Sequence, residues 1–117
     1  MLAYVLLRLA RIWADDELER LGVSVLRLVR DALPRAPTSF GWMLVALHQH
    51  LAPHRELAIA GDPAAPVVRR ALAEAAATDV VALGPAEGIP LLEGRGEVDG
   101  KTAVYVCERF ACSLPLT

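Results

Sequence analysis

The sequence of 117 residues has no apolar run long enough to form a membrane-spanning helix. Its longest run, residues 1–7, ends at Arg8, far short of the roughly 18 residues that a membrane helix needs. The N-terminus also lacks the basic start and the small-residue cleavage site of a secretory signal peptide. We therefore expect no membrane partner and a cytoplasmic location.

Cysteine and charge of one sign are also scarce. Two cysteines in a chain of this size do not make the disulfide framework of a small secreted protein, which again favours the cytosol. The formal net charge is −2 and the basic residues are scattered, so no nucleic-acid-binding surface is expected. The chain contains neither an internal repeat nor a low-complexity segment.

Apolar residues are present in excess. They make up 55% of the chain, against roughly 45–50% in ordinary soluble domains, and the mean hydropathy is positive. Because no membrane helix takes up this excess, it predicts a surface that is buried against another domain or a second copy of the chain. A dimer, or packing on a larger protein, is therefore expected.

The centre of the chain has the pattern of a strand, a helix and a second strand. Residues 57–60 and 79–83 are apolar runs, each followed by a glycine. Between them, Asp62 and Pro63 supply a helix cap and a first-turn residue, which predicts a helix that begins at Pro63. Two buried strands joined by a helix predict a parallel pair with a right-handed crossover.

Three helices are predicted before this unit, at residues 1–14, 15–33 and 40–51. The first has one broad apolar face, and the third is apolar nearly all round, which is typical of a helix buried on most sides. Asp15 or Asp16 is expected to cap the second. The apolar positions of the second helix predict a buried stripe of Leu18, Leu21, Val25, Leu28, Val29 and Ala32.

After the second strand, residues 102–107 form a third strand by their β-branched and aromatic content, and residues 108–117 are expected to be an irregular tail. The sequence thus predicts an α/β fold: three N-terminal helices, then a small, mainly parallel three-stranded sheet with a crossover helix. Residues 1–52 form a helical segment and residues 53–117 a small α/β module.

Residues 101–117, which end in Cys-x4-Cys-Ser-Leu-Pro, resemble the extreme C-terminus of the YyaL-like proteins, the spermatogenesis-associated thioredoxin-domain family. The resemblance extends upstream. Residues 57–62 are similar to an apolar strand of that family that ends in Gly-Asp, residues 6–10 to a Leu-Leu-Arg-Leu helix, and residues 34–47 to a proline-started helix. Nearly the whole chain is covered in order.

The resemblance implies that a thioredoxin-like domain and a helical barrel precede this segment in a longer protein. The redox motif and the barrel cavity would then lie upstream of Met1, so the resemblance assigns no catalytic residue here. The first three helices would be the last helices of the barrel, which would explain their apolar excess. The uncapped start at Met1 likewise suggests a chain cut from something longer.

Cys107 and Cys112 carry the most conspicuous chemistry. Four intervening residues allow a turn that brings the sulfur atoms together, so a disulfide or redox pair is one interpretation and two buried structural thiols are another. A metal would need further ligands. Of the three histidines, His48 and His50 are two apart on a helix and point in different directions, and Pro53 separates them from His54, so no metal site and no cofactor are predicted.

Gly61, Asp62 and Gly84 form a weaker candidate for ligand binding, since ligands of open α/β sheets bind at the carboxyl ends of strands. Asp62 argues against phosphate, because a capping carboxylate occupies the amide groups and repels an anion. A sugar or nucleotide hydroxyl is the remaining ligand class.

Three functions follow. The first is a non-catalytic structural module that packs on a helical barrel or self-associates, and the second is a thiol–disulfide element that uses Cys107 and Cys112. The third is small-molecule binding at the strand ends. The chain alone is not expected to be an enzyme.

Overall fold

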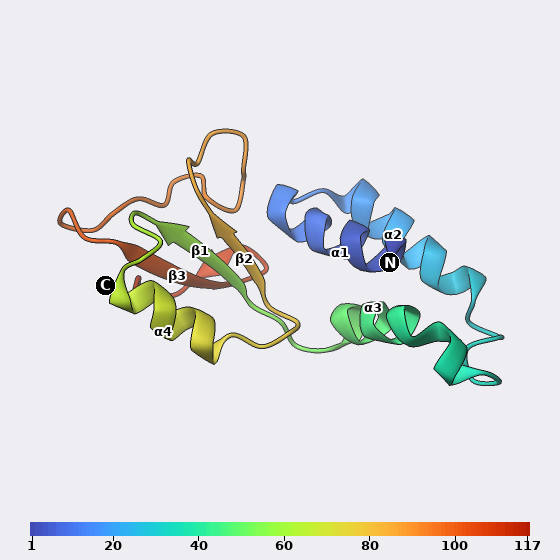
Figure 1. The fold of residues 1–117 in the computed structure, drawn as a ribbon. Helices are drawn as coiled ribbons and strands as arrows, with labels where there is room; N and C mark the ends of the chain where they lie inside the picture. Colours follow the sequence, from blue (N-terminus) through green and yellow to red (C-terminus); the bar gives the residue numbers. More distant parts are fainter. The chain divides into compact units, whose positions relative to one another are not determined.

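The computed structural model describes all residues from Met1 to Thr117, and the chain divides into two compact units, Met1–Pro53 and His54–Thr117 (Figure 1). The first unit is helical, and the second combines a sheet with one helix, which confirms the α/β class. None of the helices combines the length and the apolar character that crossing a bilayer requires.

The helical unit contains α1 (Leu2–Trp13), α2 (Asp16–Leu28), the short 3₁₀ helix η1 (Pro37–Phe40) and α3 (Gly41–Leu51). The predicted cap of the second helix is confirmed. An Asp15 carboxylate oxygen accepts hydrogen bonds from the backbone N–H groups of Glu17 and Leu18, at 2.8 and 3.1 Å. It thereby satisfies two donors that a helix start otherwise leaves open.

The core of the helical unit consists of small and branched residues from all three α-helices: Ala3, Leu7, Leu26 and Ala46. The buried stripe predicted for α2 is partly wrong. Leu21 and Leu28 are 46% and 84% exposed, whereas Gly22 and Leu26 are buried. The reason is Gly22, which lets α2 approach Leu7 of α1 and so turns the Gly22–Leu26 side of the helix inward.

The prediction that the third helix is buried on most sides is also wrong. Only Ala46 and Gln49 of α3 are buried, and Trp42, Leu44 and Val45 are exposed. Within its unit α3 packs mainly on α1. A single packed helix covers only one side of α3, so the other sides stay exposed.

The second unit is built on a four-stranded sheet in the order β2-β1-β3-β4. Its elements are β1 (Glu56–Ala60), α4 (Pro66–Glu74), β2 (Val80–Leu83), β3 (Ala103–Glu108) and β4 (Ala111–Cys112). The predicted parallel pair is confirmed, because β1 and β2 run parallel and α4 connects them. The prediction of an irregular tail is wrong in part, because residues 108–117 contain β4 and because Leu116 forms a bridge with Val104 of β3.

The prediction of a mainly parallel, three-stranded sheet is wrong. β3 runs antiparallel to β1, and β4 runs antiparallel to β3. Crossover connections between parallel strands usually contain a helix, and the connection from β2 to β3 contains none. β3 therefore enters the sheet at the end where β1 leaves it, with Ala103 opposite Ala60.

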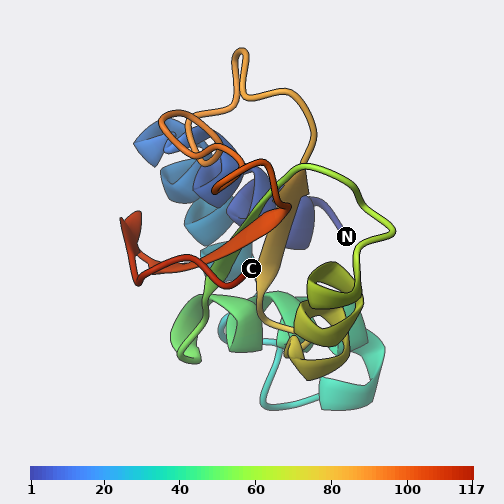
Figure 2. The ribbon, with the colours of Figure 1, turned by 90° about the vertical axis from the view of Figure 1, so that its left-hand side faces the viewer.

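The two faces of the sheet are covered differently. On one face, Ile59 and Val104 pack against Val68 of α4, which runs along the strands (Figures 1 and 2). On the other face, Ala58 and Ala82 pack against Leu91 and Leu92, from the connection between β2 and β3. Because side chains alternate along a strand, Glu56 and Cys107 fall on this second face with Ala58.

Candidate functional site

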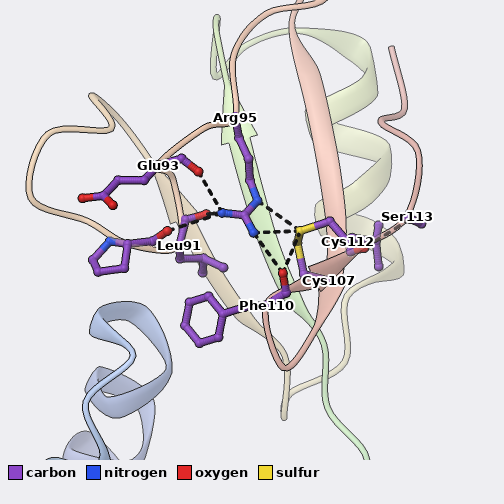
Figure 3. The surroundings of a disulfide bond; sticks show 9 residues. Leu91, Glu93, Arg95, Cys107, Phe110, Cys112 and Ser113 are labelled. Atoms are coloured by element: carbon purple, nitrogen blue, oxygen red, sulfur yellow. Dashed lines mark hydrogen bonds between the residues drawn. A yellow bond between two sulfur atoms is a disulfide. The ribbon is translucent and has the colours of Figure 1, made fainter.

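Cys107 and Cys112 are joined by a disulfide across the β3–β4 hairpin (Figure 3). The two residues lie directly opposite each other, with their Cα atoms 3.9 Å apart. The Ser113 N–H donates to the Val106 carbonyl oxygen at 2.9 Å, beside this pair, so the cysteines occupy a non-hydrogen-bonded position, where opposing side chains are closest. Of the alternatives open from the sequence, the structure forms the disulfide.

The two cysteines differ in accessibility. Cys107 is completely buried, whereas Cys112 is exposed near the end of the chain. Thiol–disulfide exchange requires in-line approach to one sulfur atom, and access decides which. Of the two cysteines, only Cys112 is thus accessible from solvent.

The hairpin turn adjoining the disulfide is formed by Arg109 and Phe110, with φ angles of 49° and 65°. Two-residue hairpin loops of this kind normally contain asparagine, aspartate or glycine, because the left-handed region costs other residues roughly 1–2 kcal/mol each. The turn thus depends on the contacts that hold it, which include the disulfide.

Arg95 connects the loop that covers this face to the hairpin. Its Nε and Nη2 atoms lie 3.0 and 2.9 Å from the Cys112 sulfur, and Nη2 also donates to the Phe110 carbonyl oxygen at 3.2 Å (Figure 3). Nη1 donates to the Leu91 carbonyl oxygen at 2.7 Å. Arg95 thus places a positive charge in contact with the Cys112 sulfur, and a cation in this position is an arrangement that stabilises a thiolate.

Glu56 is the second charged residue on this face. Its side chain is only 2% exposed; Oε1 lies 3.9 Å from Nε2 of His54, and Oε2 has no hydrogen-bond partner. A buried polar atom without a partner costs on the order of 1–3 kcal/mol, which makes the position unusual.

The sequence analysis missed both Arg95 and Glu56. Arg95 lies in a glycine-rich loop that has no periodicity to give its direction. Glu56 directly precedes the predicted apolar run. A charged residue at the start of a buried strand was the sequence signal that could have identified it.

The predicted ligand residues Gly61 and Gly84 follow the adjacent parallel strands β1 and β2. At Gly61 the φ angle is 117°, and an added Cβ would lie 2.6 Å from Thr102 Oγ1 and 2.8 Å from Glu97 Oε1. The side chains of this same unit therefore fill the space beside Gly61.

Asp62 does not cap the helix at Pro63 as predicted. Its carboxylate accepts a hydrogen bond from the Ala64 N–H at 2.8 Å, in a turn, and α4 begins only at Pro66. Proline at the first helical position explains this later start, because its fixed φ suits a helix and its missing N–H is not needed there.

A surface cavity of about 560 Å³ lies near this end of the sheet. It is lined by the first turns of α4 and by Lys101, Thr102 and Thr117, and none of the three predicted ligand residues lines it. Small-molecule binding at these residues stays a prediction.

The histidines do not gather around the cysteines. His48 and His50 lie on α3, where Nδ1 of His50 is 3.8 Å from Glu19 Oε1, and His54 neighbours Glu56 in the second unit. No group of three or more histidine, cysteine, aspartate or glutamate residues is arranged to hold a metal ion.

The chain matches none of the protein-family models, curated proteins or solved structures with which it was compared. The resemblance to the YyaL-like family therefore stays a prediction.

Proposed function

We propose that the chain carries a reversible thiol–disulfide pair, Cys107 and Cys112, and acts as a redox element of a larger protein. One observation carries this proposal: the disulfide joins an exposed and a buried cysteine, and a guanidinium group contacts the exposed one. The site has the asymmetry that exchange chemistry needs, with one cysteine exposed and the other buried.

The exchange proceeds in two steps. A thiolate of a partner dithiol attacks Sγ of Cys112, a mixed disulfide forms, and the electron pair of the broken bond moves to Sγ of Cys107. The second thiol of the partner then releases Cys112, so the partner is oxidised by two electrons and both cysteines are reduced. A thioredoxin-like domain, which the family resemblance implies, is a dithiol of this class.

Thiol alkylation followed by mass spectrometry tests the proposal. In the folded protein we expect no labelling without reductant, and after reduction Cys112 should label faster than Cys107. Arg95→Gln should slow the labelling of reduced Cys112 by about tenfold, since the cation no longer stabilises the thiolate. Arg109→Gln, on an exposed residue of the neighbouring turn, should leave the rate unchanged.

Labelling that requires unfolding, with or without reductant, would show buried structural thiols and contradict the proposal. So would a Cys112 that labels freely in protein purified without reductant.

A second function is supported by a different observation. Many large apolar side chains of the helical unit are exposed: Met1, Leu2, Val5, Trp13, Leu21, Leu28, Trp42, Leu44, Val45 and Leu51. Exposed apolar surface of this extent is typical of an interaction site. The helical unit is thus also proposed to be a non-catalytic packing module, which docks on a helical barrel domain or on a second copy of the chain.

A further inference from the structure

Glu56 is a buried carboxyl group beside the buried cysteine of the disulfide. Glu56 of β1 lies directly opposite Cys107 of β3. On the other side of β1, Glu56 lies opposite Val80 of β2. Residues in such opposing positions project from the same face, with Cβ atoms about 4.5–5.5 Å apart. A glutamate side chain spans that distance, so its carboxyl group is within reach of the Cys107 sulfur.

The groups around Glu56 leave one of its carboxylate oxygens without a hydrogen bond. Oε2 has no hydrogen-bond partner, and His54 lies 3.9 Å from Oε1, beyond hydrogen-bond distance. Arg95, from the covering loop, contacts Cys112 and backbone carbonyl groups, and Arg55, the residue before Glu56, pairs with Asp79. β2 contributes only the apolar Val80 beside it.

Closure of the disulfide requires a proton acceptor at this place. In the reduced protein Cys107 is a buried thiol, and only its thiolate attacks the mixed disulfide on Cys112. The new bond joins the two protein sulfurs, and the electron pair leaves with the sulfur of the departing thiolate. Cys107 is completely buried in the disulfide-bonded chain, so a neighbouring side chain of the protein is the nearest acceptor for its proton.

We propose that Glu56 accepts the Cys107 proton when the disulfide closes and returns it when the disulfide opens. This role rests on the reversible pair proposed above. His54, whose side chain is 21% exposed, lies beside the other carboxyl oxygen and connects Glu56 with solvent.

The closure rate of the full chain tests this role. Reduced protein is mixed with bis(2-hydroxyethyl) disulfide and quenched with acid at intervals, and mass spectrometry follows the mixed disulfide on Cys112 and its loss on closure. In Glu56→Gln, closure should be about 100-fold slower near neutral pH, the usual size of a general-base contribution. Its rate should also rise about tenfold per pH unit, because the thiol must then ionise without help.

Glu108→Gln is the matched control, since Glu108 is the next residue on β3 and is exposed. It removes the same charge and should close at the wild-type rate. The first step, formation of the mixed disulfide on Cys112, should be unaffected in both variants.

Equal closure rates in Glu56→Gln and in the wild type, with the wild type closing normally, would overturn the role of Glu56 alone. A wild-type protein that never closes would instead overturn the proposed redox function.

A second measurement needs no substitution. The closure rate of the wild-type chain is followed across the neutral pH range with the same acid quench. It should rise by much less than tenfold per pH unit, because Glu56 takes the proton and the thiol need not ionise unaided. A full tenfold rise per pH unit in the wild type would contradict the proposal.

Discussion

At the scale of single residues, Asp79 ties the start of β1 to the start of β2. Arg55 Nη2 donates to its carboxylate at 2.7 Å, and the backbone N–H groups of Ala76 and Arg55 donate at 2.8 and 3.0 Å. Burial by itself would raise the pKa of Asp79, but these hydrogen bonds outweigh it, so the pKa lies below its usual value. The hydrogen bond and charge of Asp79 raise the pKa of Arg55 in turn.

The sign of the pH dependence follows from that lowered pKa. Because Asp79 binds its proton less readily in the folded chain than in the unfolded one, the ionised form stabilises the fold at every pH above the ordinary carboxyl value of about 3.9. This stabilisation is lost as the pH falls through the pKa that Asp79 has in the folded chain.

Asp79→Asn should therefore reduce the free energy of unfolding near neutral pH by about 1–3 kcal/mol, the range for buried hydrogen bonds to a charged group. The difference from the wild type should narrow only as the pH falls below the ordinary carboxyl value and through the lowered pKa of folded Asp79, because the wild-type carboxyl group then becomes neutral as well. Hydrogen exchange of the Val80 N–H, which donates to the Arg55 carbonyl oxygen at 2.9 Å, reports on this junction. Asp99→Asn, in an exposed turn, is the control and should change little; a pH-independent effect of Asp79→Asn would contradict the expectation.

At the scale of elements, one glycine sets how α1 and α2 pack. A Cβ at Gly22 would lie 2.9 Å from Cγ of Leu7 and 3.4 Å from the Ala3 carbonyl oxygen, and Leu7 is itself buried. Alanine normally favours a helix over glycine, but here it must push the two helices apart.

Gly22→Ala should destabilise the helical unit by about 1–3 kcal/mol, the usual cost of overpacking. Gly41→Ala is the matched control, because nothing lies within 4 Å of an added Cβ at this first residue of α3. It should be neutral or raise the melting temperature slightly. Thermal unfolding followed by the fluorescence of Trp13 and Trp42, which both belong to this unit, compares the two variants. If Gly22→Ala were as stable as Gly41→Ala, the packing of α1 against α2 at Gly22 would have room for a methyl group, and the expectation would be wrong.

At the scale of the whole molecule, the apolar surface of the helical unit predicts association. We expect the isolated chain to self-associate at high micromolar concentration in sedimentation equilibrium, because the burial of exposed leucine side chains away from water is favourable. Leu28→Glu and Leu51→Glu, at positions 84% and 71% exposed, should each weaken association by placing a charge in the contact. Ala73→Glu adds the same charge at an exposed position of α4, outside the helical unit, and serves as the control. A wild-type chain that stays monomeric would refute the self-association.

The sequence by itself determined the features that depend on neighbours along the chain. Apolar periodicity and turn residues predicted the β1–α4–β2 crossover, and Asp15 predicted the start of α2, because capping and amphipathic patterns are local. Which side of α2 is buried could not be predicted from its own residues, because Gly22 faces inward only where Leu7 of α1 lies against it.

Only the tertiary structure decided the rest. The antiparallel direction of β3 depends on which end of the sheet the connection reaches, and the disulfide depends on the β4 strand that pairs with it. Arg95 comes from a loop and Glu56 from another strand, and no local pattern relates either residue to the cysteines. Arg95 reaches Cys112 and Glu56 lies opposite Cys107 only because the fold brings this loop and β1 beside the β3–β4 hairpin, and such long-range contacts are set by packing.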